Sequence, residues 1–288
     1  SEGICEVETY SRIENGHRTI RRSTFQKLME KMGRNTDRRY AVCVSKDGML
    51  LDEKREYERA FKRYDYDTAE MYLRKLKEKA SENVLTRQYI ARAEALISYS
   101  KGEISADELI DRLDEVIRIT VPNYEMYLDA NINFPFMKEE LLALMGLGVA
   151  YRKIGNSETS EKLYQKVLEC VECDYLGYPD KCTLQITVKR NLARLYAENM
   201  KYNEFIRAIE DAIELARDKD CGYKLSALLV TMAHGYIEML KLGKCEGEKK
   251  NDAEKYLRQA YYLAAARCDT VMAKRIKLYY TKYFHNGK

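Results

Sequence analysis

The chain has no tryptophan, only 3 prolines and 14 glycines in 288 residues, and no long apolar run. So few helix breakers, together with abundant Glu, Lys, Arg, Leu and Ala, predict an all-helical protein. A membrane-spanning helix needs about 20 consecutive apolar residues, and no stretch approaches that length. The sequence also starts without the basic and apolar regions of a signal peptide, so we expect a cytoplasmic protein.

Metal-binding and catalytic patterns are also scarce. The eight cysteines include one CxxC, Cys170 and Cys173, but no second CxxC or histidine pair follows at a spacing suited to zinc. We therefore expect no metal and no cofactor, and we expect Cys170 to pack as a small apolar side chain. The sequence has no phosphate-binding glycine loop, no nucleophile elbow and no HExxH motif, so an enzyme is the least favoured class.

The positive charge is concentrated near the N-terminus. The chain carries a net charge of +4, yet the stretch from Arg12 to Arg39 alone carries +6, with nine Lys or Arg against three acidic residues. The rest of the chain is therefore slightly acidic. A basic segment suits binding to nucleic-acid phosphates. Judged by charge alone, a solvated basic surface is an equally good interpretation.

Two short helices are predicted in this basic region. The first fits Val7–Glu14 and ends at Asn15-Gly16, and the second fits Ser23–Met32 and ends at Gly33. The segment SRIENG, preceded by EGIC and followed by a helix ending in KMG, resembles the repressor-type helix-turn-helix. In that family the ENG closes the helix that reads DNA.

This resemblance implies that Val7–Glu14 enters the major groove of DNA. Arg12 is the best candidate for reading a base, because its planar fork can bind two acceptors of guanine. We expect the earlier helices of such a domain to precede Ser1. The side chains expected at base edges are Val7, Glu8, Ser11 and Arg12, and those expected at phosphates are Asn15 and Arg18.

From about Leu51 onward the sequence repeats as antiparallel helix pairs. Gly148, Ala193 and Ala233 occupy the same small position in three repeats, and they follow one another at 45 and 40 residues. Each is preceded by Leu or Met and followed three residues later by Tyr. This pattern resembles the tetratricopeptide repeat, with a period longer than the usual ~34 residues. The expected domains are residues 1–33, a partial helix-turn-helix; 34–50, a linker; and 51–288, a tetratricopeptide domain for ligand binding and dimerisation.

Stacked repeats of this kind form a right-handed superhelix whose concave face is lined by the first helix of each pair. Such a face suits an extended peptide. Asn191 is the strongest candidate for binding one, because an amide can donate to a peptide carbonyl and accept from its N–H. Arg190 and Arg194 could hold a terminal carboxylate. The other side chains expected to face inward and bind are Arg152, Thr187, Thr231 and His234.

The order of the two parts suggests the function. A helix-turn-helix followed by such repeats, including GLGVAYRKIGN and NLARLYAENMKYNEF, resembles the peptide-responsive regulators of Gram-positive bacteria, the PlcR- and Rgg-like group. The resemblance implies a cytoplasmic homodimeric transcription factor for quorum sensing, in which a signalling peptide controls DNA binding. The alternative is a tetratricopeptide adaptor that docks a protein partner and does not bind DNA.

Overall fold

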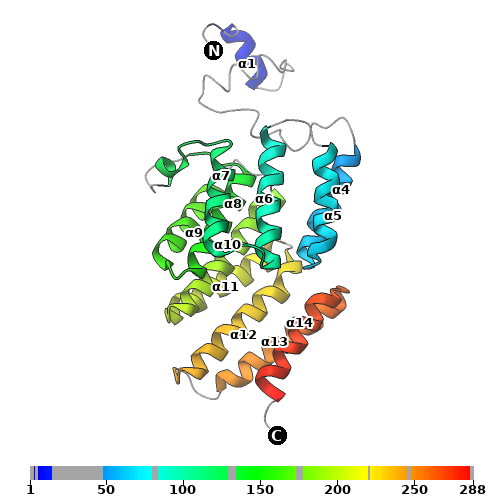
Figure 1. Cartoon of the computed structure of the whole chain (residues 1–288). Coiled ribbons are helices and arrows are strands. Elements are labelled where there is room, and N and C mark those ends of the chain that lie inside the picture. The colour runs from blue at the N-terminus through cyan, green and yellow to red at the C-terminus, as the bar shows by residue number, and fades with distance from the viewer. Residues whose placement is uncertain are drawn as a thin grey trace.

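The computed structural model describes Gly3 and residues 6–14, 48–79, 84–128, 134–172, 178–219, 221–244 and 248–285. In these ranges every regular element is a helix (Figure 1). The first, α1, spans Val7–Glu14 as the sequence predicts. The second helix predicted for the helix-turn-helix, Ser23–Met32, lies outside the described residues.

The remaining helices form antiparallel pairs, and α14 packs on the last pair. The pairs are α4 (Gly48–Lys62) with α5 (Tyr66–Lys79), α6 (Val84–Lys101) with α7 (Ala106–Arg118), α8 (Lys138–Lys153) with α9 (Ser157–Glu172), α10 (Tyr178–Glu198) with α11 (Tyr202–Asp218), and α12 (Leu225–Lys241) with α13 (Glu248–Ala266), followed by α14 (Thr270–Tyr280). Short helical turns η1 (Tyr124–Tyr127), η2 (Gly222–Lys224) and η3 (Thr281–His285) connect or extend them.

The pairs stack into a solenoid. Each second helix packs against the first helix of the next pair, and the first helices α6, α8, α10 and α12 also contact one another in succession. These first helices therefore form one continuous inner row, while α7, α9 and α11 lie outside it (Figure 1). The all-helical, tetratricopeptide-like solenoid predicted from the sequence is confirmed.

Small residues lie where neighbouring helices come closest. A Cβ atom on Gly148 would lie 2.5 Å from the ring of Tyr164, and one on Gly235 would lie 2.0 Å from the ring of Phe205. Both rings are fully buried. The Ser160 hydroxyl donates to the Gly148 carbonyl at 2.7 Å, which fastens α9 to α8 at the same crossing. Buried aromatic rings thus fill the space beside these two glycines.

The helix ends follow local sequence rules. Ser105 caps α7, where its side chain accepts from the Glu108 backbone and the Glu108 carboxylate accepts from the Ser105 backbone. After α8 the chain reverses at Gly155, whose φ of +84° favours glycine. These signals explain why the pairs α6–α7 and α8–α9 turn where they do.

Three helices begin earlier than the repeat pattern predicts. α4 begins at Gly48, inside the linker predicted for residues 34–50. In the repeat pattern, residues 243–251 form an insertion and the repeat around Ala193 starts at Lys189. The structure instead begins α13 at Glu248 and α10 at Tyr178. The early turns of α10 bury Cys182 and Ile186, so they belong to the packed helix.

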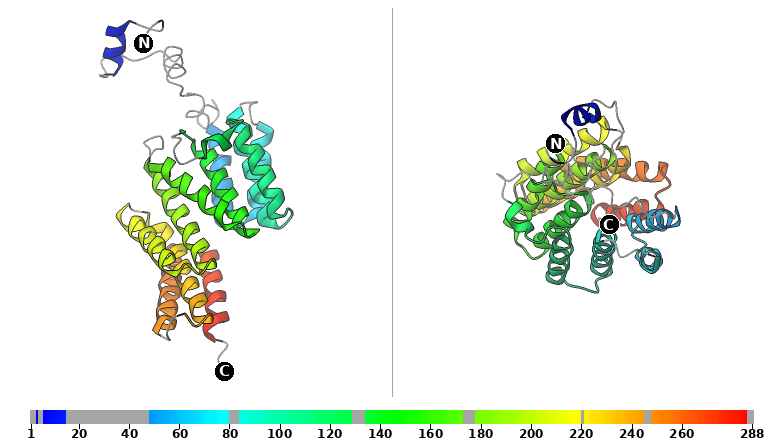
Figure 2. Two further views of the ribbon diagram at one scale, coloured as in Figure 1. Left: turned by 90° about the vertical axis from the view of Figure 1, so that its left-hand side faces the viewer. Right: turned by 90° about the horizontal axis from the view of Figure 1, so that it is seen from above.

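The solenoid curves so that its last helix, α14, approaches its first pair, α4 and α5. Tyr64, in the turn between α4 and α5, has a left-handed φ of +62°. Its ring lies 3.9 Å from the guanidinium of Arg275 on α14. In Figure 1, α14 lies below the lower ends of α4 and α5, and Figure 2 gives two further views of this curvature. The concave side of α10 is therefore faced by residues from both ends of the solenoid.

Candidate functional site

The inner helix α10 carries the densest group of the predicted site residues. Thr187, Arg190, Asn191 and Arg194 lie on its successive turns, between α8 and α12. Arg152 comes from α8, and Thr231 and His234 come from α12. The structure therefore brings the seven predicted groove residues onto three neighbouring inner helices.

Asn191 offers an amide to the concave side. Its residue is only 7% exposed, and its side chain makes no hydrogen bond to any residue in the described part of the chain. The amide therefore has both a donor and an acceptor available for a ligand.

Arg190 and Arg194 are cations without a paired carboxylate in the described ranges. The Nε atom of Arg190 is buried and has no hydrogen-bond partner. Burial lowers the pKa of Arg190, and the nearby charge of Arg194 lowers it further. Arg194 reaches water on the concave side, yet desolvation by the surrounding protein, and then Arg152, lower its pKa as well. The two arginines therefore repel each other, and Arg190 is the less solvated of the two.

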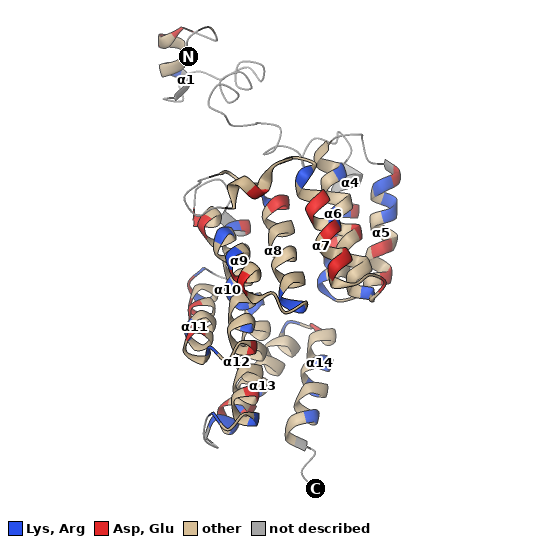
Figure 3. Ribbon diagram, turned by 60° about the vertical axis from the view of Figure 1, so that its left-hand side comes forward, with Lys and Arg blue, Asp and Glu red and all other residues tan. Residues whose placement is uncertain are grey.

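Lys224 joins this group, and the sequence reasoning did not find it. It ends η2, ahead of α12, and its ammonium lies 3.4 Å from the Thr187 hydroxyl. Burial, followed by the charges of Arg190 and Lys62, lowers its pKa to about 8. The only sequence signal was a lysine directly before an apolar inner helix. The colouring by charge in Figure 3 shows how basic and acidic positions are distributed over these helices.

Arg152 differs from the other cations because it already has a partner. Its side chain is buried and pairs with Glu198 at the end of α10. Its Nε remains buried without a hydrogen bond. The charge of Arg152 is thus balanced inside the solenoid, so this side chain offers a ligand no unpaired charge.

The two threonines and the histidine form the rest of the surface. Thr187 and Thr231 donate their hydroxyl protons to carbonyls of their own helices, so each keeps only acceptor capacity for a ligand. His234 lies over the ring of Tyr279 on α14, with the ring centroids 5.9 Å apart. Burial lowers the pKa of His234, which leaves a neutral imidazole near neutral pH.

The predicted DNA-reading face is exposed on α1. Val7 is 72% exposed, and Glu8, Ser11 and Arg12 also reach solvent. Three of these four residues are polar. Glu8 places an acidic side chain in the first turn of α1, and Arg12 places a basic side chain in its last turn. Asn15 and Arg18, predicted to contact phosphates, lie outside the described residues.

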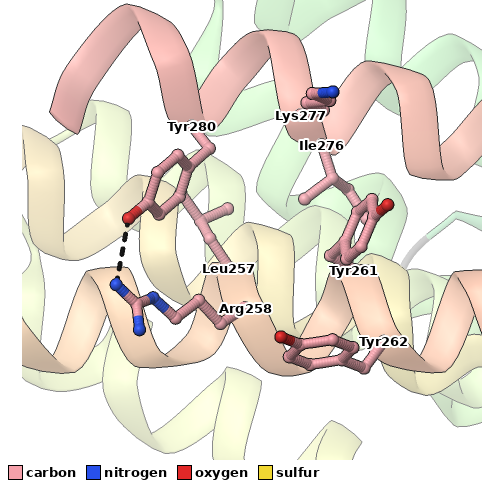
Figure 4. A pocket seen from close by; sticks show the side chains of 7 residues that line it. All are labelled: Leu257, Arg258, Tyr261, Tyr262, Ile276, Lys277 and Tyr280. Atoms are coloured by element: carbon pink, nitrogen blue, oxygen red, sulfur yellow. Dashed lines mark hydrogen bonds between the residues drawn. The ribbon is translucent and has the colours of Figure 1, made fainter. Parts of the chain in front are cut away.

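A separate hollow of about 330 Å³ lies between α13 and α14. Figure 4 shows its tyrosine-rich lining and the contact between Arg258 and Tyr280, whose polar atoms are 3.3 Å apart. None of the predicted site residues lines it. Within the described ranges, no three His, Cys, Asp or Glu side chains cluster as metal ligands would. None of the helices described combines the length and apolar character needed to cross a membrane.

Comparison with solved structures finds the same fold in two proteins that were solved with a peptide and DNA. PlcR from Bacillus thuringiensis, solved in complex with the peptide PapR7 and DNA, gives a TM-score of 0.65 at 17% identity, over 96% of this chain and 91% of that one. ComR from S. thermophilus, solved in complex with DNA and its signalling peptide ComS, gives 0.58 at 14% identity, over 96% and 90%. No protein-family model and no curated protein sequence matches. The shared fold agrees with the resemblance expected from the sequence.

Proposed function

We propose that this protein is a transcriptional regulator that binds DNA through its N-terminal helices and a short signalling peptide in the concave face of its solenoid. The observation that supports peptide binding most strongly is the amide of Asn191, which has no hydrogen bond within the described residues and lies on the inner helix α10 with Arg190, Arg194 and Thr187. A peptide backbone offers the carbonyls and N–H groups that this row lacks. The fold shared with two regulators solved with peptide and DNA supports the same assignment.

In this proposal α1 is the recognition helix. Arg12, with Val7, Glu8 and Ser11, contacts base edges in the major groove, and Asn15 and Arg18 contact phosphates. The protein acts as a homodimer, so that two such helices reach half-sites about one helical turn of DNA apart, or a multiple of it. Peptide binding shifts the solenoid between two arrangements, which changes the spacing of the two DNA-binding parts.

The proposal is tested by calorimetric titration of the chain with a pool of short linear peptides. We expect saturable binding that Asn191→Ala weakens by about 1 kcal/mol or more, the scale of a lost buried hydrogen bond. Asn203→Ala is the matched control, because Asn203 is exposed on the outer helix α11. An absence of binding by every peptide would refute the proposal and favour an adaptor that docks a protein partner. Equal losses in the two variants would refute the role of Asn191.

A further inference from the structure

Most cations inside the solenoid have an acidic partner. Arg92 on α6 and Glu139 on α8 form a buried pair with 2.7 Å between nitrogen and oxygen, and Arg152 pairs with Glu198. The fold is therefore able to supply carboxylates to interior cations. Arg190 and Lys224 are different, since neither pairs with a carboxylate anywhere in the described ranges.

Arg190 carries a guanidinium for which the described residues supply no carboxylate. Its Nε is buried and lacks a hydrogen bond there. Its guanidinium lies near Arg194 and near Tyr64, which belongs to the turn between α4 and α5. A guanidinium presents a planar set of donors that fits the two oxygens of a carboxylate. A carboxylate from a ligand would pair with this cation and lower the repulsion between the two arginines.

Lys224 lies beside Arg190 with its ammonium only loosely held. Its one protein hydrogen bond in the described ranges, to the Thr187 hydroxyl, is long at 3.4 Å, and the Tyr223 ring centroid lies 5.5 Å away. The charged groups that act on it are Arg190 from α10 and Lys62 from α4, together with the Cys221 thiol before η2. Three helical segments thus direct positive charge at one region of the concave side.

We infer that Arg190 and Lys224 form a binding site for a carboxylate of the peptide, with Arg194 at its edge. The inference rests on the proposed function and adds the chemistry of the ligand to it. The carboxylate belongs either to the C-terminus of the peptide or to an Asp or Glu side chain. Both present the same pair of oxygens to the guanidinium. The backbone of the same peptide then reaches Asn191, one residue further along α10.

The experiment uses three pools of short N-acetylated peptides with uncharged side chains. The first pool ends in a free carboxylate, the second ends in a carboxamide, and the third ends in a carboxamide but carries one Asp. Each pool is titrated into the wild type, into Arg190→Gln and into Lys189→Gln. The last variant is the matched control, because Lys189 also lies on α10 and pairs outward with Asp211 on α11 at 3.0 Å.

We expect a carboxylate-bearing pool to bind at least about 10-fold more tightly than the neutral pool, the scale of a hydrogen bond to a charged group. We expect that advantage to vanish in Arg190→Gln and to persist in Lys189→Gln. An advantage for the first pool identifies the terminal carboxylate as the source, and one for the third pool identifies a side chain.

Two results overturn the inference, and they differ in what they say about the proposed function. If the neutral pool binds as tightly as the others, or if Arg190→Gln behaves like Lys189→Gln, the carboxylate site is wrong while peptide binding stands. If no pool binds to the wild type, both the site and the proposed function are wrong.

Discussion

The half-buried Lys224 of the concave face makes peptide binding dependent on pH. Lys224 has a pKa lowered to about 8 by burial and by the charges of Arg190 and Lys62. A bound carboxylate favours the charged ammonium, so binding draws a proton onto Lys224 wherever the free protein has lost it. With a pKa of about 8, roughly nine-tenths of Lys224 is protonated at about pH 7 and roughly one-tenth at about pH 9. The affinity for a carboxylate peptide should therefore fall by up to about 10-fold over that range.

The assay is calorimetric titration of an N-acetylated peptide with a free C-terminal carboxylate at the two pH values. Acetylation is needed because a free peptide α-amino group has a pKa of about 7.7–8.0 and would titrate in the same range. Repeating the titration in two buffers of different ionisation enthalpy measures the number of protons taken up. We expect uptake approaching one proton at the higher pH and little at the lower pH.

Lys224→Met is the variant that assigns the effect. Its affinity at the lower pH should be weaker than that of the wild type, and the drop between the two pH values should disappear. The Cys221 thiol lies near Lys224, but an effect of that thiol would survive the substitution. A wild type whose affinity is flat across the range, or a pH dependence retained by Lys224→Met, would contradict the reasoning.

Without ligand, the same lysine affects folding with the opposite trend. Its pKa in the folded protein lies below the ordinary value of 10.5, so between about 8 and 10.5 the unfolded chain binds more protons than the folded one. The contribution of Lys224 to the free energy of unfolding therefore rises as pH increases through that window. Ligand affinity and intrinsic stability thus change in opposite directions over the upper part of the pH range.

Two further predictions concern the packing and the DNA-binding helix. Gly235→Ala should lower the free energy of unfolding in urea by about 1–3 kcal/mol, because its Cβ would lie 2.0 Å from the buried Phe205 ring. The loss of unfolding free energy should be smaller when Phe205→Leu is already present. It should also be smaller for Gly146→Ala, where the nearest atom is the end of the flexible Leu113 side chain. Equal losses in Gly235→Ala and Gly146→Ala would contradict the steric explanation. Arg12→Ala should weaken binding to a selected DNA duplex by about 1–3 kcal/mol and relax the preference at one base pair. Fluorescence anisotropy with single-base variants of the duplex measures both effects. An equal loss of affinity for every variant would make Arg12 a phosphate contact instead.

The repeat positions were predictable because packing imposes them. A tyrosine or phenylalanine ring leaves room for only a glycine or alanine at the facing helix, so Gly148 and Ala193 mark the crossings in the sequence as well as in the structure. The end of α1 was predictable for a local reason, since Asn15-Gly16 follows it. Once the inner helices were assigned, their spacing placed Thr187, Arg190, Asn191 and Arg194 together on α10.

Other parts of the concave face were not predictable, because they come from outside the repeat pattern. Lys224 belongs to a short turn between two pairs, Tyr64 to a turn with a left-handed backbone, and Tyr279 to the last helix. Their approach to α10 depends on how strongly the solenoid curves, and curvature results from small rotations added over every pair. The pairing of Arg152 with Glu198 was likewise not predictable from the sequence. The two residues lie 46 positions apart, at the ends of two different helices.

The unpaired cations link ligand binding to the shape of the solenoid. Burying a charge without a partner is unfavourable, so Arg190 and Lys224 lower the stability of the unliganded form, whereas Arg92 is held by Glu139. Tyr64 lies near Arg190, and its ring contacts Arg275 of α14, so the first pair and the last helix of the solenoid approach each other beside these cations. An anion bound at Arg190 therefore acts where the solenoid closes on itself. A ligand that binds more tightly to one curvature than to another shifts the protein toward that curvature, and in the proposed homodimer this is the change that would move the DNA-binding helices.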